Sequence, residues 1–109
     1  MAHIPDQLKT RPFLLIARFG ITPGKEARVM ELLLPIYKLA CSPNEPGCIT
    51  YRITRSVDKA NVLVYEEYIH EEAYKAHLAS MEYQAFMKAK DTEKLLTYLE
   101  LQVMEELKE

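Results

Sequence analysis

One histidine, His77, is the candidate residue for proton transfer. It lies within residues 72–80, where the spacing of apolar residues is typical of a helix. A histidine titrates near neutrality without help, so it can accept a proton and return it. The alternative is structural: a helical histidine that hydrogen-bonds a neighbour and fills space in the core. The residues by themselves leave both roles open.

A carboxylate lies on the strand pattern ahead of this helix. Residues 62–69 alternate, which places Glu66 and Tyr68 on one face of the expected strand. Tyr51, from an earlier alternating run, can join them on that face. A carboxylate beside tyrosines would raise the basicity of His77 or orient a phenolic ligand.

The same carboxylate also has two other interpretations. Glu66 would pair with Arg18 or Arg52 and so satisfy a buried cation. A shift of the strand pairing by one residue would instead turn Glu67 inward, because neighbouring side chains of a strand point to opposite faces. These alternatives stay open at the level of the sequence.

Aromatic side chains are plentiful enough to wall a ligand pocket. The chain has seven tyrosines and three phenylalanines but no tryptophan. The candidates for a pocket that binds a planar ring by stacking are Tyr51, Tyr68, Tyr83 and Phe86. The alternative for each of them is ordinary packing in the core.

Cofactor and metal signatures are missing from the sequence. No Cys/His pair has the spacing of a metal site, and the three glycines form no phosphate-binding loop. The two cysteines, Cys41 and Cys48, flank a proline-rich loop. A disulfide between them is the alternative, but two thiols in an intracellular chain are expected to be free. We therefore expect no metal and no cofactor.

Composition limits the class of protein. The 109 residues suit one domain, and 49% hydrophobic residues are enough for a core. A net charge of -2 gives no basic surface for nucleic acid. No apolar run approaches the ~20 residues that span a bilayer. Because residues 1–12 are polar rather than signal-like, we expect a cytoplasmic protein with no nucleic-acid or membrane partner.

The pattern of elements predicts an α+β fold. Residues 1–12 are expected as an irregular arm, and residues 13–109 as a single domain. Within it we expect strands at 13–20, 48–55, 62–69 and 96–104, a helix that follows Thr22–Pro23–Gly24 and ends by Ala40, and helices at 71–80 and 81–90. Residues 96–104 fit a helix nearly as well, but the order β-α-β-β-α needs a closing strand.

Local signals fix some of the boundaries. Thr22 or the turn beside it can cap the first helix, and Ser80 can cap the one that starts at Met81. Pro46-Gly47 is typical of a turn with the glycine in the left-handed conformation. The first strand, 13–20, is apolar nearly throughout, which suits burial on both faces.

The predicted architecture is a ferredoxin-like, four-stranded antiparallel sheet with helices on one face. Its other face would be bare and partly apolar, and exposed apolar surface of that size marks an interaction site. A second copy, packed sheet against sheet about a two-fold axis, is the simplest cover. The alternative is a monomer with a half-solvated sheet.

The order of these parts resembles the antibiotic biosynthesis monooxygenase family of dimeric α+β barrels. The resemblance is best over residues 45–80. It rests on the turn Glu45-Pro46-Gly47-Cys48, the strand residues Thr50-Tyr51-Arg52 and Tyr65-Glu66-Glu67-Tyr68, and the helix that carries His77-Leu78-Ala79-Ser80. Family members often have a second histidine where this chain has Tyr83, and the haem-degrading relatives use a tryptophan. Since there is no tryptophan here, haem breakdown is not expected.

The resemblance implies an activity that needs no cofactor. A quinol, anthrone or polyphenol that loses a proton becomes an anion that can pass an electron directly to molecular oxygen. The protein then supplies a base, with His77 and Glu66 as the candidate catalytic residues, and a dry aromatic pocket. The alternative function is a non-catalytic dimeric barrel that binds a small aromatic metabolite or acts in a stress response.

Overall fold

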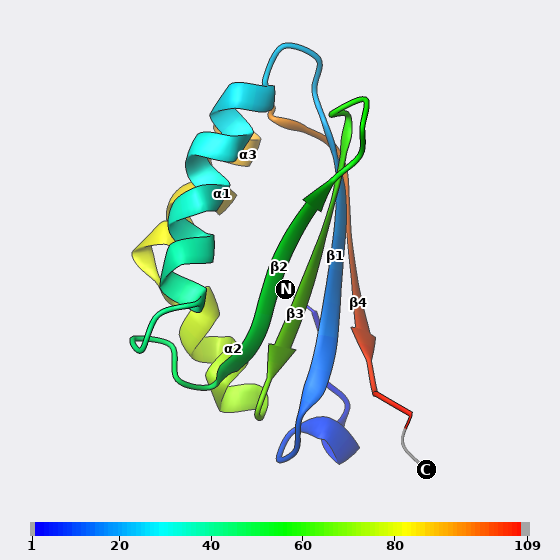
Figure 1. Ribbon diagram of the computed structural model, residues 1–109, viewed down its shortest axis with the longest axis vertical. Coiled ribbons are helices and arrows are strands. Elements are labelled where there is room, and N and C mark those ends of the chain that lie inside the picture. Colours follow the sequence, from blue (N-terminus) through cyan, green and yellow to red (C-terminus); the bar gives the residue numbers. More distant parts are fainter. Residues whose placement is uncertain (1, 108–109) are drawn as a thin grey trace.

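The computed structural model describes residues 2–107 as one sheet with helices packed on one of its faces (Figure 1). The elements follow in the order β1 (Phe13–Ile21), α1 (Glu26–Ala40), β2 (Cys48–Arg55), β3 (Asn61–Tyr68), α2 (Glu71–Leu78), α3 (Met81–Thr92) and β4 (Leu96–Met104). The sheet is antiparallel in the order β2-β3-β1-β4. The ferredoxin-like class and the closing strand at 96–104 are confirmed.

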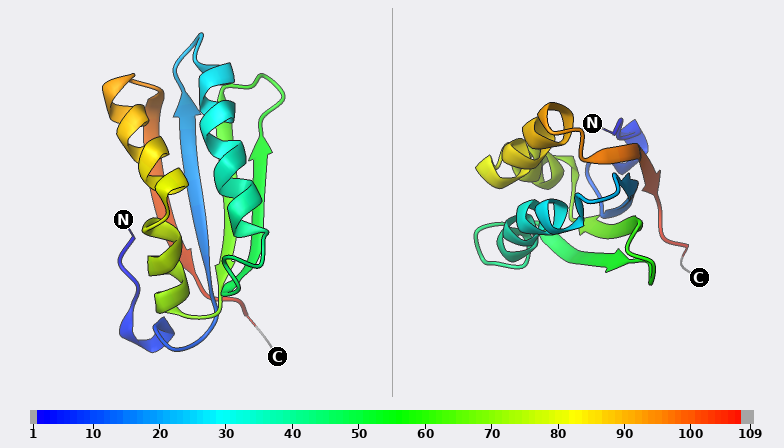
Figure 2. Two further views of the ribbon diagram at one scale, coloured as in Figure 1. Left: turned by 90° about the vertical axis from the view of Figure 1, so that its left-hand side faces the viewer. Right: turned by 90° about the horizontal axis from the view of Figure 1, so that it is seen from above.

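The helices form a second layer over the sheet. Figure 2 shows α1 lying over the β2 side, while α2 and α3 run end to end over the β4 side. On β1, the residues that face the helices are buried, from Phe13 and Leu15 to Phe19. Leu14 and Ile16 point to the other face and are only half buried. The expected burial of β1 on both faces is therefore wrong for the single chain, because every helix lies on one side.

Strand register decides which acidic residue of β3 points inward. Glu66 pairs with Leu15 on β1 and with Tyr51 on β2, both of which are buried beneath the helices. Glu66 itself is 6% exposed, whereas Glu67 on the opposite face is half buried. The register alternative that placed Glu67 inside is thus excluded.

The sequence predicted the N-terminal caps of two helices, α3 and α1. Ser80 Oγ accepts a hydrogen bond from the Tyr83 backbone N–H at 3.1 Å, as predicted. For α1 the Thr22 alternative is excluded, since the cap position is Lys25, directly after the turn at Pro23-Gly24, and the Thr22 hydroxyl donates to the Lys94 carbonyl. This bond ties the start of α1 to the segment that leads into β4.

Gly47 is required for a different reason than expected. Only Gly24 among the described glycines has a left-handed φ, at 87°, so the predicted left-handed turn at Gly47 is wrong. A Cβ on Gly47 would lie 2.4 Å from the Cβ of Ala73. The glycine therefore allows the loop before β2 to pass directly against the first turn of α2.

The N-terminal segment packs against the domain. It contains one turn of 3-10 helix at Asp6–Leu8, and Ile4 and Leu8 are buried. They pack with Phe13, Tyr68 and Tyr74 at one end of the core. None of the helices within residues 2–107 has the length and apolar composition needed to cross a membrane.

Candidate functional site

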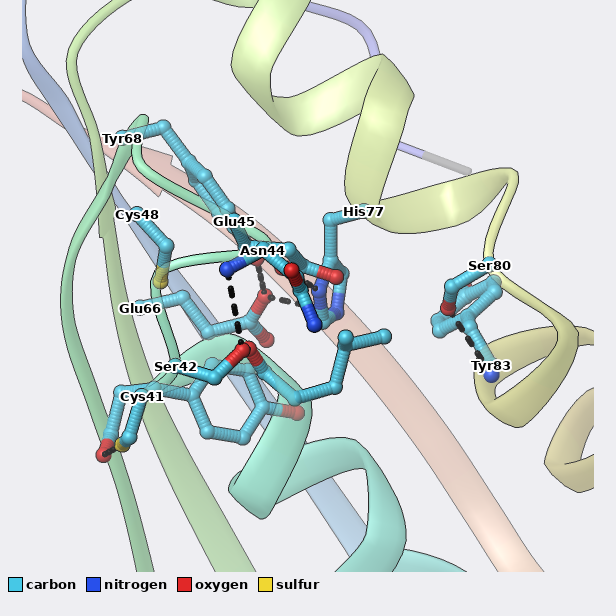
Figure 3. A network of polar contacts seen from close by, with 12 residues as sticks. Cys41, Ser42, Asn44, Glu45, Cys48, Glu66, Tyr68, His77, Ser80 and Tyr83 are labelled. Carbon is cyan, nitrogen blue, oxygen red and sulfur yellow. Dashed lines mark hydrogen bonds and ion pairs between the residues drawn. The ribbon is translucent and has the colours of Figure 1, made fainter.

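His77 is buried between two carboxylates (Figure 3). It lies in the last turn of α2, on the face that also buries Tyr74 and Leu78, and its side chain is 1% exposed. Its Nδ1 lies 2.9 Å from Glu45 Oε1, which is hydrogen-bond distance. Its Nε2 lies 3.9 Å from Glu66 Oε1. Both ring nitrogens therefore face an acidic group inside the protein.

Glu66 is held by a phenol and not by an arginine. The Tyr68 hydroxyl donates a hydrogen bond to Glu66 Oε1 at 2.5 Å. Arg18 donates to Gln102 on the far face, and among the described residues the ion-pair partner of Glu66 is His77. The alternative in which Glu66 neutralises Arg18 or Arg52 is therefore wrong, because both arginines point away from the helices.

The environment favours the protonated form of Glu66. Burial raises the pKa of this carboxyl to about 7, with a smaller contribution from the negative charge of Glu45. The hydrogen bond from Tyr68 opposes the shift, since it stabilises the carboxylate. A carboxyl with this pKa can hold or release a proton near neutral pH, which is the property that general acid–base catalysis needs.

Three of the predicted aromatic residues surround His77. The centroids of the Tyr51, Tyr68 and Tyr83 rings lie 5.4, 5.6 and 5.5 Å from the centre of the imidazole. Burial is the main cause that raises the pKa of all three phenols, to about 12 for Tyr83 and well above the usual value for Tyr51. All three phenols are therefore neutral at pH 7 and are not bases, and the Tyr68 hydroxyl donates a hydrogen bond to Glu66.

The cavity between the sheet and the helices is small. Its volume is about 40 Å³, and its lining includes Tyr51, Glu66, Tyr83 and Phe86 among apolar side chains. That volume exceeds the ~10–15 Å³ that one water needs. It is far below the ~300–1,000 Å³ of a typical ligand pocket. A ring-sized molecule would enter only if side chains move.

The predicted residues divide into those that line this cavity and those that lie behind them. Glu66 belongs to both groups, since it lines the cavity and also contacts Tyr68 and His77. Tyr68 and His77 are not among the lining residues. Phe86 is farther along α3, where its ring packs 5.9 Å from that of Phe19. The cavity thus meets the buried polar cluster at Glu66.

Sequence reasoning missed the role of Glu45. It used this residue only as the start of a turn, yet its side chain is 8% exposed and bonds His77 from 32 positions away. The loop that carries it is held by Ser42, whose hydroxyl donates to the Leu39 carbonyl and accepts from the Asn44 N–H. The only signal in the sequence was an acidic residue directly before Pro46-Gly47. No periodic pattern indicates that this residue contacts α2.

The cysteines near this loop are free thiols. Burial, together with the nearby carboxylates, raises the pKa of Cys48 to about 12. Its thiol is therefore protonated at neutral pH and is not a nucleophile. Within residues 2–107, no three His, Cys, Asp or Glu side chains are grouped so that they could hold a metal ion.

Comparison with known protein families identifies the family of this chain. A sequence model described as antibiotic biosynthesis monooxygenase matches residues 12–89. The chain belongs to this family. The match includes every residue of the cluster around His77, and the family assignment from the sequence is confirmed. No functionally curated protein shows significant similarity to the chain.

Solved structures show the same fold. Rv0793 from Mycobacterium tuberculosis is 26% identical with a TM-score of 0.77, over 90% of this chain and 97% of that one. PA3566 from Pseudomonas aeruginosa is 20% identical with a TM-score of 0.80, over 92% and 98%. SO0527 from Shewanella oneidensis is 19% identical with a TM-score of 0.76, over 91% and 94%. The chain therefore matches nearly the whole length of each of these three structures.

Proposed function

We propose that this family member is a cofactor-independent monooxygenase that oxidises a quinol, an anthrone or a polyphenolic small molecule with molecular oxygen. The observation that carries the proposal is Glu66: a carboxyl with a pKa of about 7 lines an apolar cavity and is backed by a buried histidine. Membership of the monooxygenase family supports the same reaction type.

The Glu66–His77 pair is the proton acceptor in this proposal. Glu66 is the member that lines the cavity, so it takes the proton from the substrate hydroxyl or activated C–H. His77 does not line the cavity, but its Nε2 lies 3.9 Å from Glu66 Oε1, so it stabilises the pair after Glu66 has taken the proton. A base whose pKa lies near the working pH combines a usable ionised fraction with enough proton affinity.

The reaction balances without a cofactor. The deprotonated substrate passes one electron to oxygen, and the resulting carbon radical and superoxide combine into a peroxide anion. This anion takes back the proton held by the Glu66–His77 pair and becomes a hydroperoxide, which restores the base. For an anthrone, loss of water from that hydroperoxide converts the CH₂ carbon into a carbonyl, so substrate and O₂ become a quinone and H₂O. The neutral phenols of Tyr51 and Tyr83, which line the cavity, would donate hydrogen bonds to the anion.

Substrate entry requires the cavity to enlarge. Leu99 on β4 and Met87 on α3 both line it, and Leu99 is 36% exposed, so the cavity approaches the surface between these two elements. Methionine is flexible enough to change rotamer at low cost. We propose that a planar ring enters at this edge and displaces Met87, with Tyr51, Tyr83 and Phe86 forming its walls and Tyr68 behind Glu66.

A homodimer is part of the same proposal. The far face of the sheet presents Leu14, Ile16 and Leu63 half buried and Tyr65 41% exposed. These side chains form an apolar strip that no helix within residues 2–107 covers, and a second sheet is the cover that a two-fold axis supplies. Pairing would bury the strip of both copies.

Oxygen uptake by metal-free protein tests the enzymatic proposal. Across a panel of hydroquinones and anthrones, we expect at least one compound to be oxidised faster than in buffer, with formation of the quinone. Glu66→Gln should lower kcat by about 100-fold or more, since general-base catalysis contributes about that much. Glu67→Gln, its neighbour on the opposite face, is the matched control and should keep full activity.

Two results would count against the enzymatic proposal. One is that no compound in the panel outpaces buffer, and the other is that Glu66→Gln retains the full rate. The second candidate function is non-catalytic binding of a small aromatic metabolite, which the aromatic lining of the cavity by Tyr51, Tyr83 and Phe86 would also serve. In that case calorimetry with the same panel would show binding without oxygen uptake.

A further inference from the structure

Glu45 is a buried carboxylate outside the proposed substrate cavity. It comes from the loop between α1 and β2, its side chain is 8% exposed, and it does not line the cavity next to Glu66. Its Oε1 lies 2.9 Å from His77 Nδ1, while its Oε2 is buried without a hydrogen-bond partner among the described residues. His77 is therefore the group that stabilises this carboxylate inside the protein.

The donor and acceptor properties of the two groups fix their arrangement. An ionised carboxylate can only accept hydrogen bonds, and a neutral imidazole donates from one nitrogen and accepts at the other. A proton on Nδ1 satisfies Glu45, whereas a lone pair there would face the carboxylate oxygen and leave Glu45 with two unsatisfied oxygens. The buried setting makes the second arrangement costly.

We infer that Glu45 is a positioning residue that keeps the His77 proton on Nδ1 and thereby presents the Nε2 lone pair to Glu66. The catalytic consequence rests on the proposed function: Nε2 is then free to receive a proton that Glu66 takes from the substrate. Glu45 touches neither the cavity nor the reacting atoms and acts through the imidazole.

The titratable groups around this unit come from several elements. They are Glu45 and Cys48 from the loop and the start of β2, Tyr51 from β2, Glu66 and Tyr68 from β3, Tyr74 from α2 and Tyr83 from α3. No lysine or arginine in the described chain forms an ion pair with Glu45 or Glu66. The His77 imidazole is therefore the ion-pair partner of both carboxyls.

Imidazole ¹⁵N shifts test the inference on the complete protein and need no substrate. The chain has three histidines, and the signals of His77 are assigned as those lost in His77→Gln. In the wild type, we expect the neutral form of His77 to carry its proton on Nδ1. In Glu45→Gln the amide can donate to Nδ1, so the proton should move wholly or partly to Nε2. Ser42→Ala, which removes two loop hydrogen bonds but leaves Glu45, should match the wild type.

Several results would overturn the inference. They are a proton on Nε2 in the wild type, a ring that stays doubly protonated up to about pH 10, and an unchanged Nδ1–H form in Glu45→Gln. A change in Ser42→Ala as large as that in Glu45→Gln would also overturn it, because loop disorder would then explain both. If Glu45→Gln does not fold, Glu45→Asp and the wild-type spectrum still decide the question.

Kinetics separate this inference from the proposed function. On a substrate that the wild type oxidises, Glu45→Gln should lower kcat about 10- to 100-fold, as loss of an orienting partner typically does, with KM within about twofold. The rising limb of its pH profile should move to lower pH, because the negative charge that disfavours ionised Glu66 is gone. An unchanged kcat and profile would contradict the positioning role. Absence of activity in the wild type would reject the function but leave the tautomer result intact.

Discussion

Tyr68 and Glu66 lie two residues apart on one face of β3, and the Tyr68 phenol donates a 2.5 Å hydrogen bond to Glu66 Oε1. Both side chains are buried, so this bond stabilises the ionised form of a carboxyl that burial alone would keep protonated to still higher pH. The proton affinity of Glu66 is thus set by burial and a phenol acting in opposite directions.

Removing that phenol should make Glu66 harder to ionise. We expect Tyr68→Phe to raise the pKa of Glu66 above about 7, and to move the rising limb of the pH–rate profile upward by about one unit. Tyr74→Phe is the control for loss of a nearby phenol, because the Tyr74 hydroxyl accepts a hydrogen bond from the Ala2 backbone N–H and not from or to Glu66. A downward shift of the limb in Tyr68→Phe would contradict the prediction.

Stability should depend on pH through Glu66. The pKa of this carboxyl is raised from 4.5 to about 7 on folding, so the folded protein binds its proton more tightly than the unfolded chain. This contribution is complete below about pH 4.5 and is lost as the pH rises through about 7. This difference between the two pKa values corresponds to about 3 kcal/mol.

Glu66→Gln should therefore stabilise the protein at alkaline pH. The amide of this variant keeps an oxygen that accepts from Tyr68 but carries no charge, so the free energy of unfolding should exceed that of the wild type by about 2–3 kcal/mol at pH 8. The difference should shrink toward pH 5. Urea denaturation at a series of pH values measures it, and a constant difference across the series would show that Glu66 does not titrate between pH 5 and 8.

Gly47 should tolerate no side chain unless α2 makes room. A Cβ there would lie 2.4 Å from the Cβ of Ala73, so Gly47→Ala should lower the free energy of unfolding by about 1–3 kcal/mol. Ala73→Gly removes the clashing atom. The double variant should therefore recover part of the loss beyond the sum of the single effects, measured as a double-mutant cycle. Additive effects would indicate that the two residues do not meet.

The uncovered sheet face predicts the assembly. Light scattering should show a particle of about 25 kDa at micromolar concentration, twice the 12.7 kDa chain. Ile16→Glu places a charge in the centre of the apolar strip and should yield the single chain. Val57→Glu, in the fully exposed hairpin loop, is the control and should leave the dimer intact. A wild-type particle of 12.7 kDa would contradict the two-fold packing.

The sequence by itself determined the order of elements and which site residues share a face of one element. Alternation placed Glu66 with Tyr68, helical spacing placed His77 on a helix, and the need for a closing strand settled residues 96–104. These features follow from the periods of about two residues in a strand and about 3.6 in a helix, which can be read directly from the spacing of apolar and polar residues.

Only the tertiary structure decided what these residues contact. Glu45 reaches His77 across 32 positions because Gly47 lets the loop lie against Ala73, and no local pattern encodes that approach. The 40 Å³ cavity likewise depends on how side chains from the sheet and two helices fill a shared volume. Periodicity shows which side chains share a face of an element. The residues that they contact, and the cavity volume left between them, depend on how distant segments pack.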